Sequence, residues 1–275
     1  MKVGVSTWSV LNTDLSSAIK AIGDAGFEYI ELWGEVPHAY HDWVDRKLLK
    51  DTLSSYDMTV TLHAPFTDLN MASPFQPVRA AVARALDEFV KFGVQLGAKL
   101  ITAHPGSVHN SALVARSAEN SIQILQSMVK ASEGILTICI ENQARSSSKY
   151  AFPLASTVES LELMLAEVDG SRFTLDTGHA HVSGLDPLAL AQREGTKLAE
   201  IHLSDNKGAS DDHLIPGEGT ADLGRLIDKL TQTDVLLCLE LDPHRYSQDQ
   251  VIAAASKVKQ QVVKRLRGSD SQVHE

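Results

Sequence analysis

Six apolar segments of this 275-residue chain each end beside a side chain that can bind a metal ion. The segments are short and rich in aliphatic and β-branched residues, as expected for buried parallel strands. They are Thr59 to Leu62, Leu100 to Ala103, Leu136 to Ile140, Arg172 to Leu175, Leu198 to Ile201 and Val235 to Leu239. The residues that follow them are His63, His104, Glu141, Asp176, His202 and Glu240. A barrel whose strands all point the same way would bring these six ends together at one mouth.

Three further potential ligands lie close behind these strand ends, namely His179, Asp211 and His213. A single histidine after a strand is usually a packed or surface residue, but histidine makes up only 11 of the 275 residues. Chance is therefore a poor explanation for the whole set. A buried carboxylate also needs a partner or a metal. Carboxylate oxygens and imidazole nitrogens without thiolates suit zinc, manganese, cobalt or iron(II) better than calcium.

Strand and helix patterns alternate along the whole chain. Two more apolar runs, Val3 to Val5 and Tyr29 to Leu32, bring the number of predicted strands to eight. Between the strands, apolar residues recur at helical spacing, for example at Leu15, Ile19 and Ile22. This alternation predicts a parallel sheet with helical crossovers, and eight units at this length favour a closed (β/α)8 TIM barrel in a single domain.

Capping residues in the sequence mark several helix boundaries. Asp14 is a predicted N-cap of the first helix, and Gly97 is predicted to end the long third helix. A last helix over about Gln248 to Leu266 should pack against the barrel. We therefore predict a barrel domain over residues 1–267 and a frayed C-terminal tail over residues 268–275.

Composition restricts the partners of the chain. The net charge of −10 and the isoelectric point near 5.5 argue against nucleic acid or anionic membrane as a partner. No apolar stretch is long enough to span a bilayer, and the N-terminus lacks a basic segment followed by a signal-peptide core. Cys139 and Cys238 lie inside predicted strands, where they are expected as buried free thiols. We expect a cytoplasmic protein, whereas the sequence carries no signal for an oligomeric state.

Two glutamates stand out within the predicted site. Glu141 shares one face of its strand with Cys139, and Glu240 shares one face with Cys238, because side chains alternate along a strand. The two carboxylates are therefore expected to face each other across the barrel mouth. Two carboxylates beside a metal suit proton transfer between adjacent carbon atoms.

Seven short motifs together resemble the xylose isomerase-like TIM-barrel superfamily, which includes sugar phosphate isomerase/epimerase-type proteins and the endonuclease IV nucleases. The resemblance extends over nearly the whole chain. The motifs are HAPFTDLNMAS from His63, AHPG from Ala103, IEN from Ile140, LDTGHA from Leu175, IHLSDN from Ile201, DDHLIPGEG from Asp211 and LELD from Leu239.

The epimerase-like branch of this superfamily implies one divalent metal, often manganese. The resemblance places its ligands on Glu141, Asp176, His202 and Glu240. It also implies that one glutamate removes the proton alpha to a substrate carbonyl and that the other returns it through an enediolate. A carbohydrate substrate and an isomerase or epimerase acting on a sugar or sugar phosphate follow from this branch.

The endonuclease IV branch implies three zinc ions held by nine ligands, and each has a counterpart here. These counterparts are the four residues of the epimerase-like set together with His63, His104, His179, Asp211 and His213. An apurinic-site phosphodiesterase is therefore the alternative function. The acidic chain, its modest length and the scarcity of Lys and Arg after the first three strands count against it. Other metal-dependent lyases or dehydratases and a noncatalytic binding module are further alternatives.

Loops after the strands supply candidates for substrate contact. They are Trp8, Trp33, Arg145, His179, Lys207 and His244. The two tryptophans are candidates to stack on a sugar face, and the two cations to neutralise a substrate phosphate or carboxylate. Simple packing and solvation are equally plausible roles for such residues. Asp205, three residues after His202, is a candidate to orient that histidine.

Overall fold

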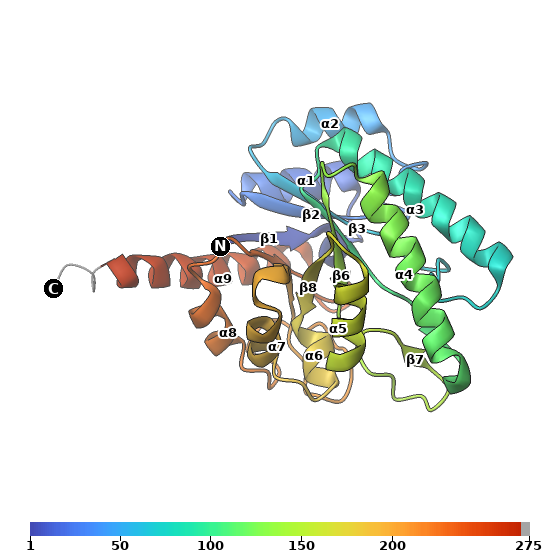
Figure 1. The fold of residues 1–275 in the computed structure, drawn as a ribbon. Coiled ribbons are helices and arrows are strands. Elements are labelled where there is room, and N and C mark those ends of the chain that lie inside the picture. Colours follow the sequence, from blue (N-terminus) through green and yellow to red (C-terminus); the bar gives the residue numbers. More distant parts are fainter. Residues whose placement is uncertain (271–275) are drawn as a thin grey trace.

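The computed structural model describes residues 1–270 and shows a closed barrel of eight parallel strands surrounded by helices (Figure 1). The ring runs β1-β10-β9-β8-β6-β4-β3-β2. Its strands are β1 (Lys2–Ser6), β2 (Tyr29–Trp33), β3 (Thr59–His63), β4 (Leu100–Ala103), β6 (Thr137–Glu141), β8 (Arg172–Asp176), β9 (Leu198–Leu203) and β10 (Leu236–Leu239). The predicted single-domain (β/α)8 TIM barrel is confirmed.

The strands continue slightly beyond the predicted apolar segments. His63, Glu141 and Asp176 are the last residues of their strands, and His202 lies inside β9. Glu240 directly follows β10. The side chains of the four strand residues are thus fixed by strand backbone, because the hydrogen-bonded ladder holds each of the four in a defined register.

Helices cover the outside of the ring. They are α1 (Leu15–Asp24), α2 (Arg46–Leu53), α3 (Gln76–Leu96), α4 (Val114–Ala131), α5 (Val158–Glu167), α6 (Thr177–Val182), α7 (Pro187–Glu194), α8 (Leu223–Leu230) and α9 (Gln248–Asp270), with 3-10 turns η1 (Thr7–Val10), η2 (Ser111–Leu113) and η3 (Gly195–Lys197). Asp14 Oδ1 accepts the Ser17 N–H at 3.0 Å, and Gly97 ends α3 with φ of 78°, as predicted. Within the described residues, no helix has the length and apolar character needed to cross a membrane.

The last described part of the chain is helical. Helix α9 continues to Asp270, three residues into the predicted tail; its first part packs against β1, and its C-terminal end projects away from the barrel (Figure 1). Residues 271–275 lie outside the described part of the chain. The division into residues 1–267 and 268–275 stays a prediction.

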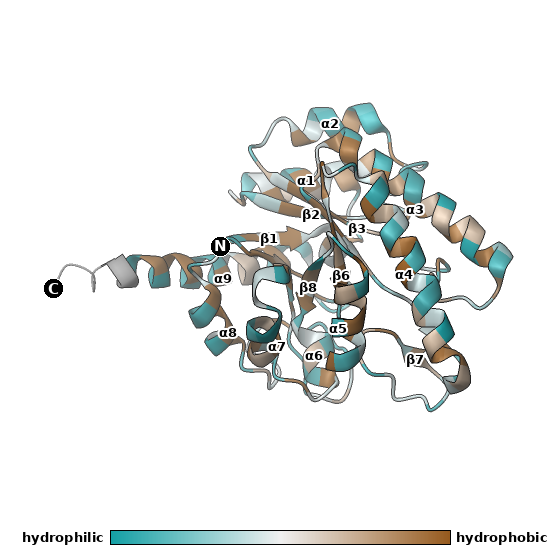
Figure 2. Ribbon diagram, in the orientation of Figure 1, coloured by the Kyte–Doolittle hydropathy of each residue, from teal (hydrophilic) through white to brown (hydrophobic). Residues whose placement is uncertain are grey.

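Apolar residues fill the space between the strands and the helices. Figure 2 shows hydrophobic residues along the strands and on parts of the helices, with hydrophilic residues common on the outer turns. Cys139 and Cys238 are free and buried inside the ring, as predicted. An antiparallel pair of two-residue strands, β5 (Ser107–Val108) and β7 (Phe152–Pro153), was not predicted, because so short a pairing leaves no periodic pattern.

Candidate active site

A cavity of about 460 Å³ opens at the C-terminal ends of the barrel strands. Seven of the nine predicted ligands line it, and the other two, Asp176 and His202, are fully buried beside it. Trp8 and Trp33 lie in its wall with their ring centres 6.0 Å apart. A second cavity of about 300 Å³ shares Phe66, His104 and other residues with the first, so the opening extends toward the β5–β7 pair.

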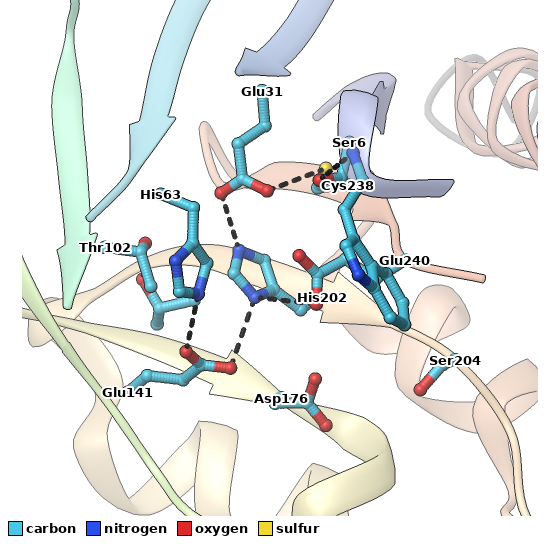
Figure 3. A network of polar contacts seen from close by, with 12 residues as sticks. Ser6, Glu31, His63, Thr102, Glu141, Asp176, His202, Ser204, Cys238 and Glu240 are labelled. Carbon is cyan, nitrogen blue, oxygen red and sulfur yellow. Dashed lines mark hydrogen bonds and ion pairs between the residues drawn. The ribbon is translucent and has the colours of Figure 1, made fainter. Parts of the chain in front are cut away.

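Four of the predicted ligands form a compact central cluster. Each of Glu141, Asp176, His202 and Glu240 offers one ligand atom, and these atoms lie within 4.8 Å of one another. His202 Nδ1 is 3.3 Å from Glu141 Oε1 and 3.4 Å from Glu240 Oε2 (Figure 3). Asp176 Oδ2 and Glu240 Oε1 are buried without a hydrogen-bond partner. Unpartnered carboxylate oxygens at this depth are costly, and a bound cation would relieve that cost.

The other carboxylate oxygen of Glu141 faces two more histidines. Its Oε2 is 2.8 Å from His104 Nε2 and 3.4 Å from His63 Nε2. The His104 ring also stacks on Phe66 at 4.1 Å between ring centres. His63 and His104 therefore extend the central cluster toward the open cavity.

A second ligand cluster adjoins the central one through His179, whose Nδ1 is 3.5 Å from Glu141 Oε1. Asp211 Oδ2 is 3.1 Å from both His179 Nε2 and His213 Nε2. Gly178 makes this approach possible, because a Cβ at that position would lie 2.9 Å from Asp211 Oδ1 and 2.7 Å from Ser204 Oγ. The glycine of the LDTGHA motif thus permits close packing of α6 against the Asp211 loop.

Three of these imidazoles share one hydrogen-bonding pattern, and a fourth reverses it. The Nδ1–H groups of His63, His179 and His213 are placed to donate to the backbone carbonyls of Ala64, Asn142 and Glu240, at 2.9, 2.8 and 3.0 Å. Each then directs Nε2 at a carboxylate. His202 has the reverse arrangement, with Nε2 3.0 Å from Glu31 Oε2 and Nδ1 facing the cluster. Metal-binding histidines typically donate one ring N–H to a carbonyl or carboxylate in this way, which frees the other nitrogen.

The buried charges shift one another's proton affinities. Burial disfavours ionised Glu141, yet His104 and His202 hold the pKa of this carboxyl well below its usual range. Burial raises the pKa of Glu240 to about 8, and the charges of Glu31 and Glu141 act in the same direction. Burial lowers the pKa of His104 to about 4. Strong shifts of opposite sign within one cavity are typical of functional sites.

Two acidic residues of the barrel interior were missed by the sequence reasoning. Glu31 lies mid-strand in β2, fully buried, and contacts His202 from the side opposite Glu141 (Figure 3). Glu200 lies in β9, where it accepts hydrogen bonds from Thr102 and Thr61 at 2.6 and 3.1 Å and from the hydroxyl of Tyr29. Period-two alternation was the available signal, since Glu200 shares a strand face with His202.

The role predicted for Asp205 is not the one found. Instead of contacting His202, its carboxylate accepts backbone N–H groups from Asn206, Gly217, Gly219 and Ala221, at 2.8 to 3.1 Å. Asp205 also forms a two-way backbone pair with Leu214. It therefore shapes the loop that carries Asp211 and His213, rather than orienting a strand residue.

The predicted substrate contacts divide into two groups. Trp8, Trp33 and His179 line the cavity. Arg145, Lys207 and His244 are exposed, and within the described chain none of the three is a lining residue of either cavity. Loop cations can follow a site closely in sequence and still point into solvent.

Glu31 offers a test of the imidazole arrangement. Replacing Glu31 by Gln removes the anion that favours a proton on His202 Nε2, and we expect metal affinity to fall about tenfold to a hundredfold. Isothermal titration with manganese or zinc measures this effect. Glu200→Gln is the comparison variant, because Glu200 Oε2 lies farther from the same His202 Nε2, at 3.6 Å, and its hydrogen bonds go to hydroxyls. Equal losses in both variants would contradict a specific role of Glu31.

A closed parallel barrel with buried carboxylates and imidazoles at its mouth defines a (β/α)8 protein with a candidate site at the strand ends. Residues 19–261 match the model of the Xylose isomerase-like TIM barrel family, and the chain belongs to that family. The earlier resemblance to this superfamily is therefore confirmed.

Individual relatives and solved structures are similar to this chain over most of its length. An uncharacterized protein of Methanocaldococcus jannaschii, MJ1311, is 28% identical over 239 residues, which cover 84% of this chain and 80% of that protein. Fructoselysine 3-epimerase of Shigella flexneri is 25% identical over 244 residues, covering 82% and 84%. The crystal structure of a D-tagatose 3-epimerase-like protein superposes with a TM-score of 0.84 at 25% identity, over 99% of this chain and 100% of that one.

Proposed function

We propose that this protein is a divalent-metal-dependent sugar isomerase or epimerase that moves a proton alpha to a carbonyl group. The observation that carries the proposal is the convergence of Glu141 and Glu240, from strands three apart in the ring, on the two sides of His202 Nδ1. The similarity to a fructoselysine 3-epimerase and to a D-tagatose 3-epimerase-like protein supports this choice of chemistry.

The proposed metal ligands are Glu141, Asp176, His202 and Glu240. Three carboxylates and one imidazole suit manganese, zinc or a related ion, and the unpartnered oxygens of Asp176 and Glu240 fit a cation. When bound, such an ion would polarise the substrate carbonyl and stabilise negative charge on its oxygen atoms. His63, His104, His179, Asp211 and His213 remain available for further ions or for substrate hydroxyls, so one to three ions can be accommodated.

The protein's own groups would carry the proton. We assign Glu141 and Glu240 as the base and the acid on opposite sides of the reacting carbons: one takes the carbon-bound proton, and the other returns a proton to the enediolate. Trp8 and Trp33 would pack against the sugar and exclude water, and the histidines around Glu141 would contact its hydroxyls.

The lining of the cavity favours a sugar without a phosphate group. Among the described residues, no Lys or Arg side chain lines either cavity at the barrel mouth. A substrate phosphate would meet Glu141, Glu240 and Asp211 without a counter-ion from the protein, which is unfavourable. A free ketose or a ketose with an uncharged substituent is therefore the preferred substrate class.

The proposed chemistry predicts that a carbon-bound hydrogen of the substrate exchanges with solvent. In deuterated water with manganese, a converted ketose should gain deuterium at C2 or C3, because a carboxyl proton can exchange between its removal and its return. Proton NMR on a panel of free ketoses and ketose phosphates measures this incorporation, with metal-stripped protein as the control. Conversion of a substrate without deuterium incorporation would exclude the enediolate route.

A trinuclear zinc phosphodiesterase is the second candidate function. The observation in its favour is that eight of the nine ligands fall into three adjoining clusters, one of which is His179, Asp211 and His213, and that the ninth, His104, contacts Glu141. The net charge of −10 and the absence of lining cations in the described residues count against a DNA backbone as the ligand. Incision of an abasic-site duplex by catalytic amounts of protein, lost in His104→Ala, would favour this candidate over the epimerase.

A further inference from the structure

We propose that His41, Asp42 and Glu88 form a separate zinc site on the outside of the barrel, which ties the loop after β2 to helix α3. His41 and Asp42 lie in the loop between β2 and α2, and Glu88 lies on α3. None of the three lines the cavity at the barrel mouth. The site is therefore distinct from the proposed active site.

The spacing of the three ligand atoms fits a tetrahedral ion. His41 Nε2 is 3.5 Å from Asp42 Oδ1 and 3.5 Å from Glu88 Oε2, and all three atoms lie within 4.8 Å of one another. Zinc bonds of about 2.0–2.2 Å at tetrahedral angles separate neighbouring ligand atoms by roughly 3.3–3.6 Å. Both distances from the imidazole match this separation, and small rotations of the two exposed carboxylates can adjust the third.

His41 is the strongest evidence for a metal site here, because its ring is buried and neither ring nitrogen has a hydrogen-bond partner. His41 is only 4% exposed, and its Nδ1 and Nε2 both lack a hydrogen-bond partner. Its ring is packed beside Tyr40 and near Phe89, with ring centres 4.6 and 6.3 Å away. A buried imidazole nitrogen without a partner is costly. Here it faces two carboxylates at a distance too long for a hydrogen bond but suited to a shared cation.

The ligand set selects the class of metal. One imidazole with two carboxylates favours zinc or cobalt over calcium and magnesium, which prefer sites made wholly of oxygen. Asp42 and Glu88 are 71% and 52% exposed, so water can complete the coordination. Because the protein side chains occupy three positions and the fourth faces solvent, we assign a peripheral site for a single zinc ion.

Such an ion would stabilise a loop that supports the cavity wall. The same loop carries Glu35, whose Oε1 accepts the backbone N–H groups of Phe66 and Thr67 at 2.7 Å each. Phe66 and Thr67 line the cavity. Zinc between the loop and α3 would therefore hold Glu35 and, through it, the segment after β3.

Metal stoichiometry in matched charge variants tests the site. Glu88→Gln and Asp87→Asn each remove one negative charge from neighbouring exposed positions of α3, but Asp87 contacts Lys91 at 2.7 Å rather than the cluster. Full-length proteins are dialysed against zinc chloride, and bound zinc is measured by elemental analysis. We expect Glu88→Gln to bind one equivalent fewer than wild type, and Asp87→Asn to bind as wild type does.

The same pair in an Asp176→Ala background separates this site from the barrel mouth. We expect the difference of one equivalent to persist there, together with a rise in melting temperature on zinc addition that Glu88→Gln reduces and Asp87→Asn retains. Equal zinc content and equal thermal shifts in Glu88→Gln and Asp87→Asn would overturn the site and leave His41 as an ordinary partner of two surface carboxylates.

Discussion

Replacing Glu141 or Glu240 by Gln is expected to lower turnover of a converted ketose by about a hundredfold or more, the usual contribution of a general base or acid. Glutamine keeps an oxygen that can bind a metal but removes the group that accepts or returns the proton. Metal binding should therefore survive in part while catalysis is lost. Steady-state kinetics, with elemental analysis of the same samples, measures both quantities.

The double variant provides a sharper version of this experiment. If the two glutamates act on one proton path, losing both should cost little more than losing either one, because residues that act as a unit are not additive. Glu119→Gln, an exposed change on α4, is the control for handling and folding. Turnover close to wild type in either single variant would show that the corresponding carboxylate does not carry the proton.

The architecture was predictable because local patterns and the global fold agree. The apolar runs predicted as strands are strands, and the polar residue after each run marks the C-terminal end where a barrel places its chemistry. Asp14 and Gly97 fix helix boundaries through interactions that depend on near neighbours only. The short β5–β7 pair escaped prediction because it joins segments that are distant in sequence and carries no period.

The sequence predicted the site residues at the strand ends, but not the mid-strand residue that contacts them. His63 and Glu141 stand at the ends of apolar runs, so their position alone marks them. Glu31 lies mid-strand, where a carboxylate gives no sign that a buried imidazole partners it. Asp205 was placed near His202 by sequence spacing, yet its partners are backbone N–H groups up to 16 residues away. Such contacts depend on loop geometry, which a strand and helix pattern does not encode.

Replacing Asp176 by Ala is expected to abolish metal binding at the central cluster, measured as the loss of one bound ion by elemental analysis. Asp176 contributes a buried carboxylate with an unpartnered Oδ2 to that cluster. It also has a structural role, since its Oδ1 accepts the His179 N–H at 2.6 Å and caps α6. Loss of the cap alone should cost about 1 kcal/mol of stability.

Asp176→Asn separates the two roles of this residue. Asparagine keeps an oxygen that can cap α6 but lacks the negative charge that the metal requires, so we expect little change in unfolding free energy and a large loss of affinity. Asp176→Ala should lose both properties. Chemical denaturation of metal-stripped protein measures the stability that the helix cap contributes. Titration with manganese or zinc measures the metal affinity. Retention of full metal stoichiometry in both variants would remove Asp176 from the ligand set, and with it the arrangement on which the proposed proton transfer depends.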